Sequence, residues 1–257
     1  MNGAAAISLQ RFFIIYLLLL LVLALMKLCR VSQSKLLLVG SIRMTVQLVL
    51  AGLILTYIFK HPHPLFTVAY VVVMMIFSIH RVLSKNADLN RRFKAAVGFS
   101  LACSGISIIL FFVLVIVNQN IFNPQYVIPL SGMVFGNAMT GANLGLKTFR
   151  ESLESERARI EALLNFGGTP REILLPFVNR ALETAMLPTL NSMIGMGVVS
   201  LPGMMTGQIL SGTLPTTAIL YQIAIMIAIC TVVCLSVFGS LYLGYHTLYN
   251  DRSQLLL

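Results

Sequence analysis

The stretch that decides the fold covers residues 95–146: AAVGFSLACSGISIILFFVLVIVNQNIFNPQYVIPLSGMVFGNAMTGANLGL. It contains no Asp, Glu, Lys or Arg. A transmembrane helix needs about 20 apolar residues, so this run is long enough for two membrane spans. The polar segment 118–124, which ends in Pro124, predicts a break between them.

The rest of the chain repeats this pattern. Of its 257 residues, 58% are hydrophobic and 10% are charged, whereas a soluble domain carries about 25% charged residues. These figures exclude a soluble globule, and they also exclude a disordered chain, which needs few apolar residues. We expect an all-α, polytopic membrane protein in which residues 1–257 form a single transmembrane domain. About seven spans are predicted: residues 12–26 (extended back to residue 4), 36–59 and 60–81, two within 95–146, and two within 184–250 that are separated near 211–215.

The charges predict the orientation of these spans. Lys and Arg, which give a net charge of +10, gather in alternate connections between the spans. Basic loops stay in the cytoplasm, so the N-terminus is expected outside and the C-terminus in the cytoplasm, as for a bacterial inner membrane protein. The lipid bilayer thus accounts for the basic charge, and no nucleic acid is expected as a partner because no basic stretch alternates with aromatic residues.

One long segment, residues 147–183, resembles a soluble protein. It has six basic and six acidic side chains. A helix is predicted over 149–166 and ended by Gly167-Gly168, and Thr169-Pro170-Arg171-Glu172 is a capping box that starts a second amphipathic helix. This cytoplasmic helix pair between spans five and six either rests on lipid headgroups or docks a soluble partner.

Two segments inside the predicted spans share the pattern G-M-x-x-G followed by a carboxamide, namely 132–137 and 203–208. Their small residues allow close packing of helices. The preceding Pro129 and Pro202 predict irregular backbone, which is tolerated at membrane depth where it lines a cavity. Helix packing and a transport route both remain possible interpretations.

Other polar residues interrupt the spans. Arg43 and Gln47 lie one helical turn apart on one face, and Arg43 either reaches the membrane surface or has a function. Asn191 and Gln222 fit hydrogen bonds between helices or contact with a substrate.

These motifs together resemble the FetB family of ABC transporter permeases, which is related to plant aluminium-tolerance permeases. The resemblance covers about residues 36–252 and is carried by the segments Arg43-x3-Gln47-Leu48, 128–139, 199–207 and Ala218-Ile219-x2-Gln222-Ile223. In addition, Glu161 to Gly167 is similar to the E-A-A-x3-G loop with which such permeases dock onto an ATPase, and 173–176 is similar to its I-x-L-P ending. Relatives often have Asp and Lys where this chain has Asn191 and Ile194.

The resemblance implies a non-enzymatic permease subunit, present as a homodimer, that exports iron or another metal with a separate FetA-type ATP-binding subunit. ATP and Mg²⁺ belong to that partner, because no G-x-x-x-x-G-K-[ST] motif occurs in this chain and no cofactor is expected in it. A self-contained secondary transporter or channel is the alternative. The expected substrate pathway comprises Arg43, Gln47, Met133, Asn137, Asn191, Met204, Gln208 and Gln222. The expected ATPase-docking residues are Arg157, Glu161, Gly167, Thr169 and Glu172, and the metal ligands are unknown.

Overall fold

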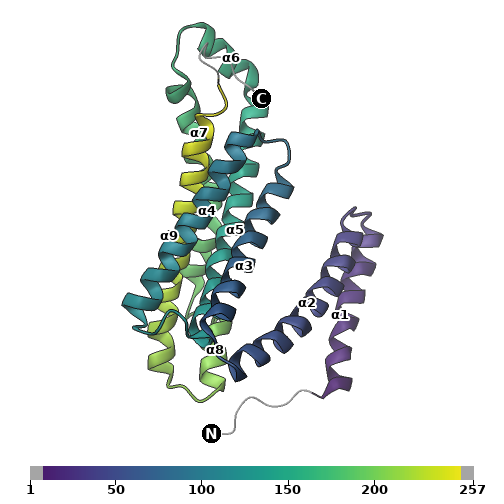
Figure 1. The fold of residues 1–257 in the computed structure, drawn as a ribbon. Helices are drawn as coiled ribbons and strands as arrows, with labels where there is room; N and C mark the ends of the chain where they lie inside the picture. The colour runs from purple at the N-terminus through teal and green to yellow at the C-terminus, as the bar shows by residue number, and fades with distance from the viewer. Residues whose placement is uncertain (1–7, 250–257) are drawn as a thin grey trace.

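The computed structural model describes residues 8–249, and helices make up nearly all of this part (Figure 1). The π-helical turn η1 continues α4 directly. In chain order the helices are α1 (Leu9–Leu28), α2 (Ser34–Lys60), α3 (Pro64–Lys85), α4 (Arg91–Phe111), η1 (Phe112–Ile116), α5 (Pro124–Ser155), α6 (Arg157–Asn165), α7 (Pro170–Gly195), α8 (Gly203–Leu210) and α9 (Pro215–Tyr245).

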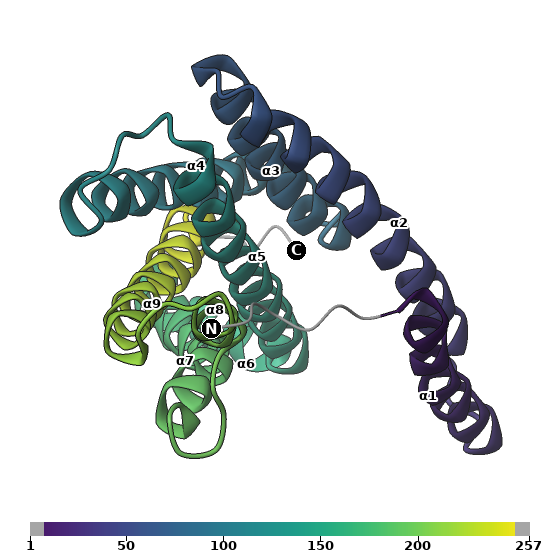
Figure 2. The ribbon, with the colours of Figure 1, turned by 90° about the horizontal axis from the view of Figure 1, so that it is seen from below.

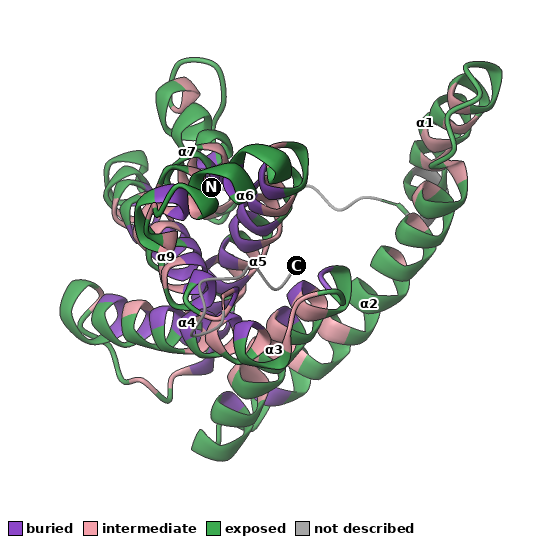
Figure 3. Cartoon of the chain, turned by 90° about the horizontal axis from the view of Figure 1, so that it is seen from above, coloured by how far each residue is buried: buried purple, intermediate pink, exposed green. Residues whose placement is uncertain are grey.

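The core lies in a bundle of α3, α4, α5, α7 and α9. Figure 3 shows the buried residues concentrated in this bundle, whereas α1 and α2 are almost entirely exposed. These two helices pack against each other as a hairpin that lies to one side of the bundle (Figures 1 and 2). At the opposite ends of the bundle lie α6 and α8 (Figure 1).

Two glycines one helical turn apart bring α5 close to α9. A Cβ atom on Gly141 would lie 2.7 Å from Cγ1 of Val233, and one on Gly145 would lie 2.7 Å from Cγ1 of Val237. Both distances are shorter than van der Waals contact, so any larger residue would force the valines or their helix to shift. Small residues spaced in this way allow helix backbones in membranes to approach closely.

The chain is a polytopic membrane protein. Within the described residues, four helical segments are long and apolar enough to cross a bilayer, namely α2, α3, α4 with η1, and α9. The apolar part of α1, Phe12–Leu28, is shorter. The other two predicted spans correspond to parts of α5 and α7, which are less apolar and continue into the charged segment.

The predicted break between the fourth and fifth spans is confirmed, because α5 begins at Pro124 with Asn123 as its N-cap. The expected irregularity at Pro129 is wrong, since α5 continues through it. Pro129 is only the sixth residue of α5, so it removes one hydrogen bond near the helix start.

The predicted segment 149–166 is helical except near Glu156 and at its last residue, but it is not one separate helix. Its first part belongs to α5, which reaches Ser155, and α6 starts anew at Arg157. Ion pairs one turn apart support this extension of α5: Lys147 with Glu151 at 3.7 Å and Arg150 with Glu154 at 3.6 Å.

The second predicted amphipathic helix is not separate from span six, because α7 runs from Pro170 to Gly195 without a break and includes Pro176 and Pro188. Span six itself is shorter than expected. It ends at Gly195, a loop follows, and the second G-M-x-x-G segment lies on the short helix α8.

Candidate functional site

A cavity of about 360 Å³ lies between α5, α7, α8 and α9. It borders the last turns of α7 and the first turns of α9, so it is nearer to α8 than to α6. Side chains three or four residues apart share one face of a helix. This spacing accounts for the residues that α7 and α9 contribute: Ala185, Pro188, Thr189 and Ser192, and Gln222, Ile225, Met226 and Ile229.

The cavity brings together four of the eight residues predicted for a substrate pathway. Met133 and Asn137 come from α5, Met204 from α8 and Gln222 from α9. They are far apart in the sequence, so their common location results from the fold. Their role in transport stays a prediction.

The other four predicted pathway residues do not line this cavity. Asn191 is exposed on α7, next to the cavity residue Ser192, and Gln208 lies one turn beyond Met204 on α8. Arg43 and Gln47 lie on α2, outside the bundle.

Arg43 instead contacts the neighbouring helix. The central carbon of its guanidinium group lies 5.8 Å from the ring centroid of Phe77 on α3, which is within the range of a cation–π interaction. This contact bridges α2 and α3, two helices that share little buried surface.

Two carboxamides and four hydroxyl side chains line the cavity. Asn137 donates from Nδ2 to the carbonyl oxygen of Met133, at 2.8 Å. Gln222 is only 5% exposed, and its Nε2 lies 3.7 Å from Sδ of Met196. Its Oε1 is buried and has no hydrogen-bond partner among the described residues. A buried amide oxygen without a hydrogen-bond partner costs free energy, and Gln222 could recover this cost by contacting a ligand in the cavity.

Sequence reasoning missed several cavity residues, including Met196, Ser200 and Met226. Met226 lies one turn from Gln222 on α9, so helical spacing could have identified it. Met196 and Ser200 lie in the loop after α7, where no sequence period applies. This loop turns at Gly197, whose φ is +85°, and Gly197 donates its backbone N–H to Ser200 at 2.9 Å.

The two G-M-x-x-G segments do not pack helices together within this chain. A Cβ atom on Gly136, Gly203 or Gly207 would meet nothing within 4 Å. At Gly132 it would meet only the flexible end of Met74, at 3.0 Å. Close helix packing is provided by Gly141 and Gly145 instead, in a segment that the sequence analysis did not select for it.

A second candidate site lies at the opposite end of the bundle, where the end of α5, the helix α6 and the start of α7 form a projection (Figure 1). Its residues include six basic and six acidic side chains. We call residues 147–183 the helical tip. Gly167 ends α6 as predicted, with a φ of +87°. The N–H of Gly168 donates to the carbonyl of Leu163 at 3.0 Å, which completes a Schellman motif.

The capping box at the start of α7 is confirmed. The hydroxyl of Thr169 accepts from the backbone N–H of Glu172 at 3.3 Å and lies 2.7 Å from its carboxylate. Hydrogen bonds from the Thr169 side chain and backbone lower the pKa of Glu172 below its usual value. Arg157 and Glu161 pair with each other at 2.9 Å on α6.

The sequence analysis missed the most exposed apolar residue of the helical tip. Phe166, at the end of α6, is 89% exposed. The residues below it are firmly packed, because Leu153, Ile160 and Leu174 are buried in the core. The exposed ring of Phe166, on a packed base, is thus available for contact with another molecule.

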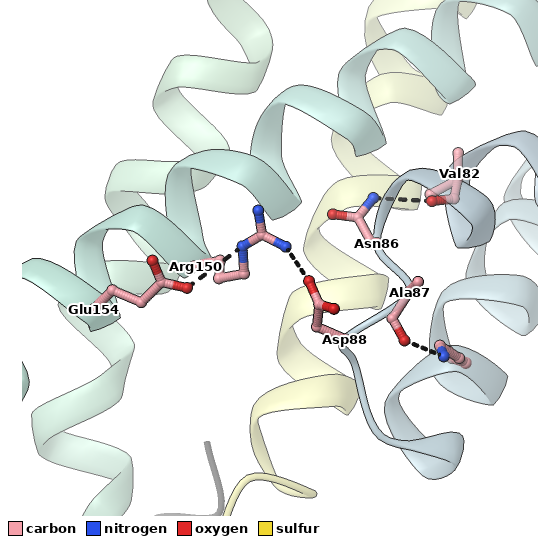
Figure 4. A network of polar contacts seen from close by, with 7 residues as sticks. Val82, Asn86, Ala87, Asp88, Arg150 and Glu154 are labelled. Atoms are coloured by element: carbon pink, nitrogen blue, oxygen red, sulfur yellow. Dashed lines mark hydrogen bonds and ion pairs between the residues drawn. The ribbon is translucent and has the colours of Figure 1, made fainter.

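An ion pair joins the helical tip to the connection between α3 and α4 (Figure 4). Arg150 donates to the carboxylate of Asp88 at 3.0 Å and pairs with Glu154 on its own helix. In the same connection Asn86 donates to the carbonyl of Val82 at 2.9 Å. Because Asp88 is mostly exposed, its pair with Arg150 orients the connection more than it stabilises the fold.

Metal ligands of the usual kinds are not clustered. Residues 8–249 contain no group of three or more His, Cys, Asp or Glu side chains placed to hold a metal ion. Of the described residues that line the cavity, none carries a charge. The cavity can therefore offer only neutral oxygen, nitrogen and thioether donors.

Comparisons with known proteins identify the family. The chain matches the model described as "Uncharacterised protein family (UPF0014)" over residues 9–249. It is 32% identical to UPF0014 membrane protein YjkA of Bacillus subtilis over 92% of this chain and 93% of that protein.

Two further relatives carry functional names. The protein of Escherichia coli named "Probable iron export permease protein FetB" is 32% identical over 83% of this chain and 82% of its own length. "Protein ALUMINUM SENSITIVE 3" of Arabidopsis thaliana is 32% identical over 83% of this chain and 77% of its own. No solved structure matches this chain. The resemblance that the motifs indicated is therefore confirmed, and the chain belongs to the UPF0014 family of membrane proteins.

Proposed function

We propose that this protein is the permease subunit of an ABC exporter that moves iron or another metal ion out of the cytoplasm. Two copies would pair with two ATP-binding subunits, and those partners would bind ATP and Mg²⁺. The permease would cross the membrane seven times, with α1, α2, α3, α4 with η1, α5, α7 and α9. Its N-terminus would lie outside and its C-terminus in the cytoplasm, in a bacterial inner membrane.

The helical tip is the observation that carries this proposal. A connection that only rested on the membrane would turn apolar side chains toward lipid. Here α5 and α7 extend past the other helices and place α6 at their apex (Figure 1), with Phe166 exposed and acidic and basic groups around it. Balanced charge of this kind gives little attraction to anionic lipid and suits a protein partner.

The connection between the helical tip and the cavity supports coupled transport. Both α5 and α7 run unbroken from the tip to the cavity wall. A displacement of the tip by a partner would therefore reach Met133 and Ser192 through two continuous helices. The metal cargo is supported by the relative named as a probable iron export permease.

The test is to purify the tagged chain in mild detergent from membranes of its own organism and to identify bound proteins. We expect a P-loop ATPase to co-purify, and its ATP hydrolysis to rise with the exported metal ion, with ferrous iron as the first ion assayed. Phe166→Ala should lose the ATPase. Val198→Ala is the matched control and should keep it, because Val198 is 92% exposed in the loop at the opposite end.

Each result has a clear meaning. An ATPase that ignores iron would retain the permease and overturn iron as its cargo. Equal ATPase binding by the Phe166→Ala and Val198→Ala variants would overturn docking through the helical tip. If wild-type protein brings down no ATPase and its transport follows an ion gradient without ATP, the protein is a secondary transporter or a channel.

A further inference from the structure

Methionines concentrate around the cavity. A side pocket of about 520 Å³ adjoins it and shares Met196, Gln222 and Met226 with its wall. Of the 13 methionines in the chain, six line one or both of these spaces: Met133, Met193, Met196, Met204, Met205 and Met226. They come from α5, α7, α8, α9 and the loop between α7 and α8.

These methionines border open space. Methionine often fills irregular gaps in a core, and such a role predicts side chains surrounded by other atoms. Met133, Met196, Met204 and Met226 instead line a cavity that stays open at about 360 Å³. The position of these methionines therefore fits contact with a ligand better than the filling of a gap in the core.

The donor chemistry selects the kind of ligand. Thioether sulfur is a soft ligand that suits Cu(I), whereas carboxylates and imidazoles suit harder cations. The described lining of the cavity has neither Asp, Glu nor His. Without negative charge it cannot offset the desolvation of a divalent or trivalent ion, but a monovalent soft cation loses much less hydration energy.

Gln222 provides an independent indication of a ligand. It is 5% exposed, its Oε1 has no partner among the described residues, and it lines both spaces. Its amide nitrogen lies 3.7 Å from Sδ of Met196, so the amide and a thioether already share one part of the wall. A cation there would satisfy the amide oxygen that is now left without a partner.

We propose that the cavity binds a soft monovalent cation, with Cu(I) as the representative ion, through the thioethers of Met133, Met196 and Met204, and that the amide oxygen of Gln222 adds only a weak electrostatic contact. This inference rests on the proposed function only in treating the ion as cargo. Binding itself needs no ATPase, so it can be tested on the isolated permease.

The experiment is a competition titration of detergent-purified protein with Cu(I), kept reduced by ascorbate, against a coloured Cu(I) chelator. All four cysteines are first changed to alanine, because thiolates would compete for the ion. We expect one Cu(I) per chain. The double variant Met133→Leu/Met204→Leu should bind about tenfold or more weakly, and leucine keeps the side-chain volume nearly constant.

Met139→Leu is the matched control, because Met139 lies on α5 with Met133 but lines neither space. It should bind Cu(I) as tightly as the unchanged chain. X-ray absorption of the loaded protein should show sulfur neighbours around copper, and Fe²⁺ should not compete.

Several results would overturn the proposal: no Cu(I) binding, equal losses in the Met139 and the Met133/Met204 variants, or copper surrounded only by oxygen and nitrogen. None of them depends on ATPase co-purification. If no ATPase co-purifies, the proposed ABC partnership is overturned, but a positive Cu(I) titration would still support the cation site.

Discussion

Gly145 is the position where one added methyl group has the most predictable effect. In the Gly145→Ala variant the new Cβ would lie 2.7 Å from Cγ1 of Val237 on α9 and 3.4 Å from Cβ of Ala185 on α7. Val237 or its helix α9 must shift to admit the new atom, whereas the distance to Ala185 is that of ordinary contact. Overpacking of this kind costs about 1–3 kcal/mol.

The replacement of glycine by alanine also stabilises a helix by about 1 kcal/mol, and a control is needed to isolate the packing cost. Gly136→Ala supplies it, because a Cβ on Gly136 of the same helix meets nothing within 4 Å. The helix-propensity gain cancels between the two variants. The free energy of unfolding of Gly145→Ala should therefore be about 1–3 kcal/mol lower than that of Gly136→Ala.

The assay is thermal unfolding in detergent followed by circular dichroism, since the chain has no tryptophan for fluorescence. On the scale of soluble proteins of this size, the two midpoints should differ by about 2–12 °C. Val237→Ala removes the crowding atom, so the double variant should lose less than the sum of the single variants. Equal midpoints for Gly145→Ala and Gly136→Ala would refute the close approach of α5 and α9.

Two further predictions concern single contacts. Phe77→Leu should destabilise the protein by about 0.5–1 kcal/mol more in the wild type than in an Arg43→Leu background, because the cation–π interaction exists only in the wild type. A double-mutant cycle of thermal unfolding measures this coupling energy. A coupling energy of zero would exclude the contact. The lowered pKa of Glu172 means that its carboxylate stabilises the capping box above the usual Glu pKa, and that this stabilisation is lost as the pH falls through the lowered value. Amide hydrogen exchange in the first turn of α7, corrected for its intrinsic pH dependence, should thus show loss of protection on acidification. Thr169→Ala should lose that protection already at neutral pH, and unchanged protection in the variant would contradict the capping role.

Much of the fold could be predicted because its signals are local. The break before Pro124 follows from a run of polar residues, and the turn at Gly167 follows from the left-handed conformation that glycine adopts readily. The extension of α5 to Ser155 could not be predicted in the same way. It depends on burial of Phe149 and Leu153 against other helices, which no short sequence window reveals.

The candidate cavity was predictable only in part, for a related reason. Met133 and Met204 stood out because each lies in a G-M-x-x-G pattern, but that pattern was also read as a helix-packing motif, which Gly136 and Gly207 do not support within this chain. Met196 lies in a loop whose shape depends on backbone hydrogen bonds around Gly197. The exposed ring of Phe166 was missed because an apolar residue in an amphipathic pattern is ordinarily expected to be buried.

The two prolines inside α7 have a mechanical consequence. A proline lacks the N–H that would bond to the carbonyl four residues earlier, and helices bend at such places. Pro188 leaves the carbonyl of Thr184 without its helical donor, and its own ring forms part of the cavity wall. The backbone ladder of α7 therefore lacks one hydrogen bond beside the cavity, and the helix bends there more easily than elsewhere. Pro188 and the residues after it form part of the cavity wall. A small bend of α7 at Pro188 would therefore change the volume of the cavity.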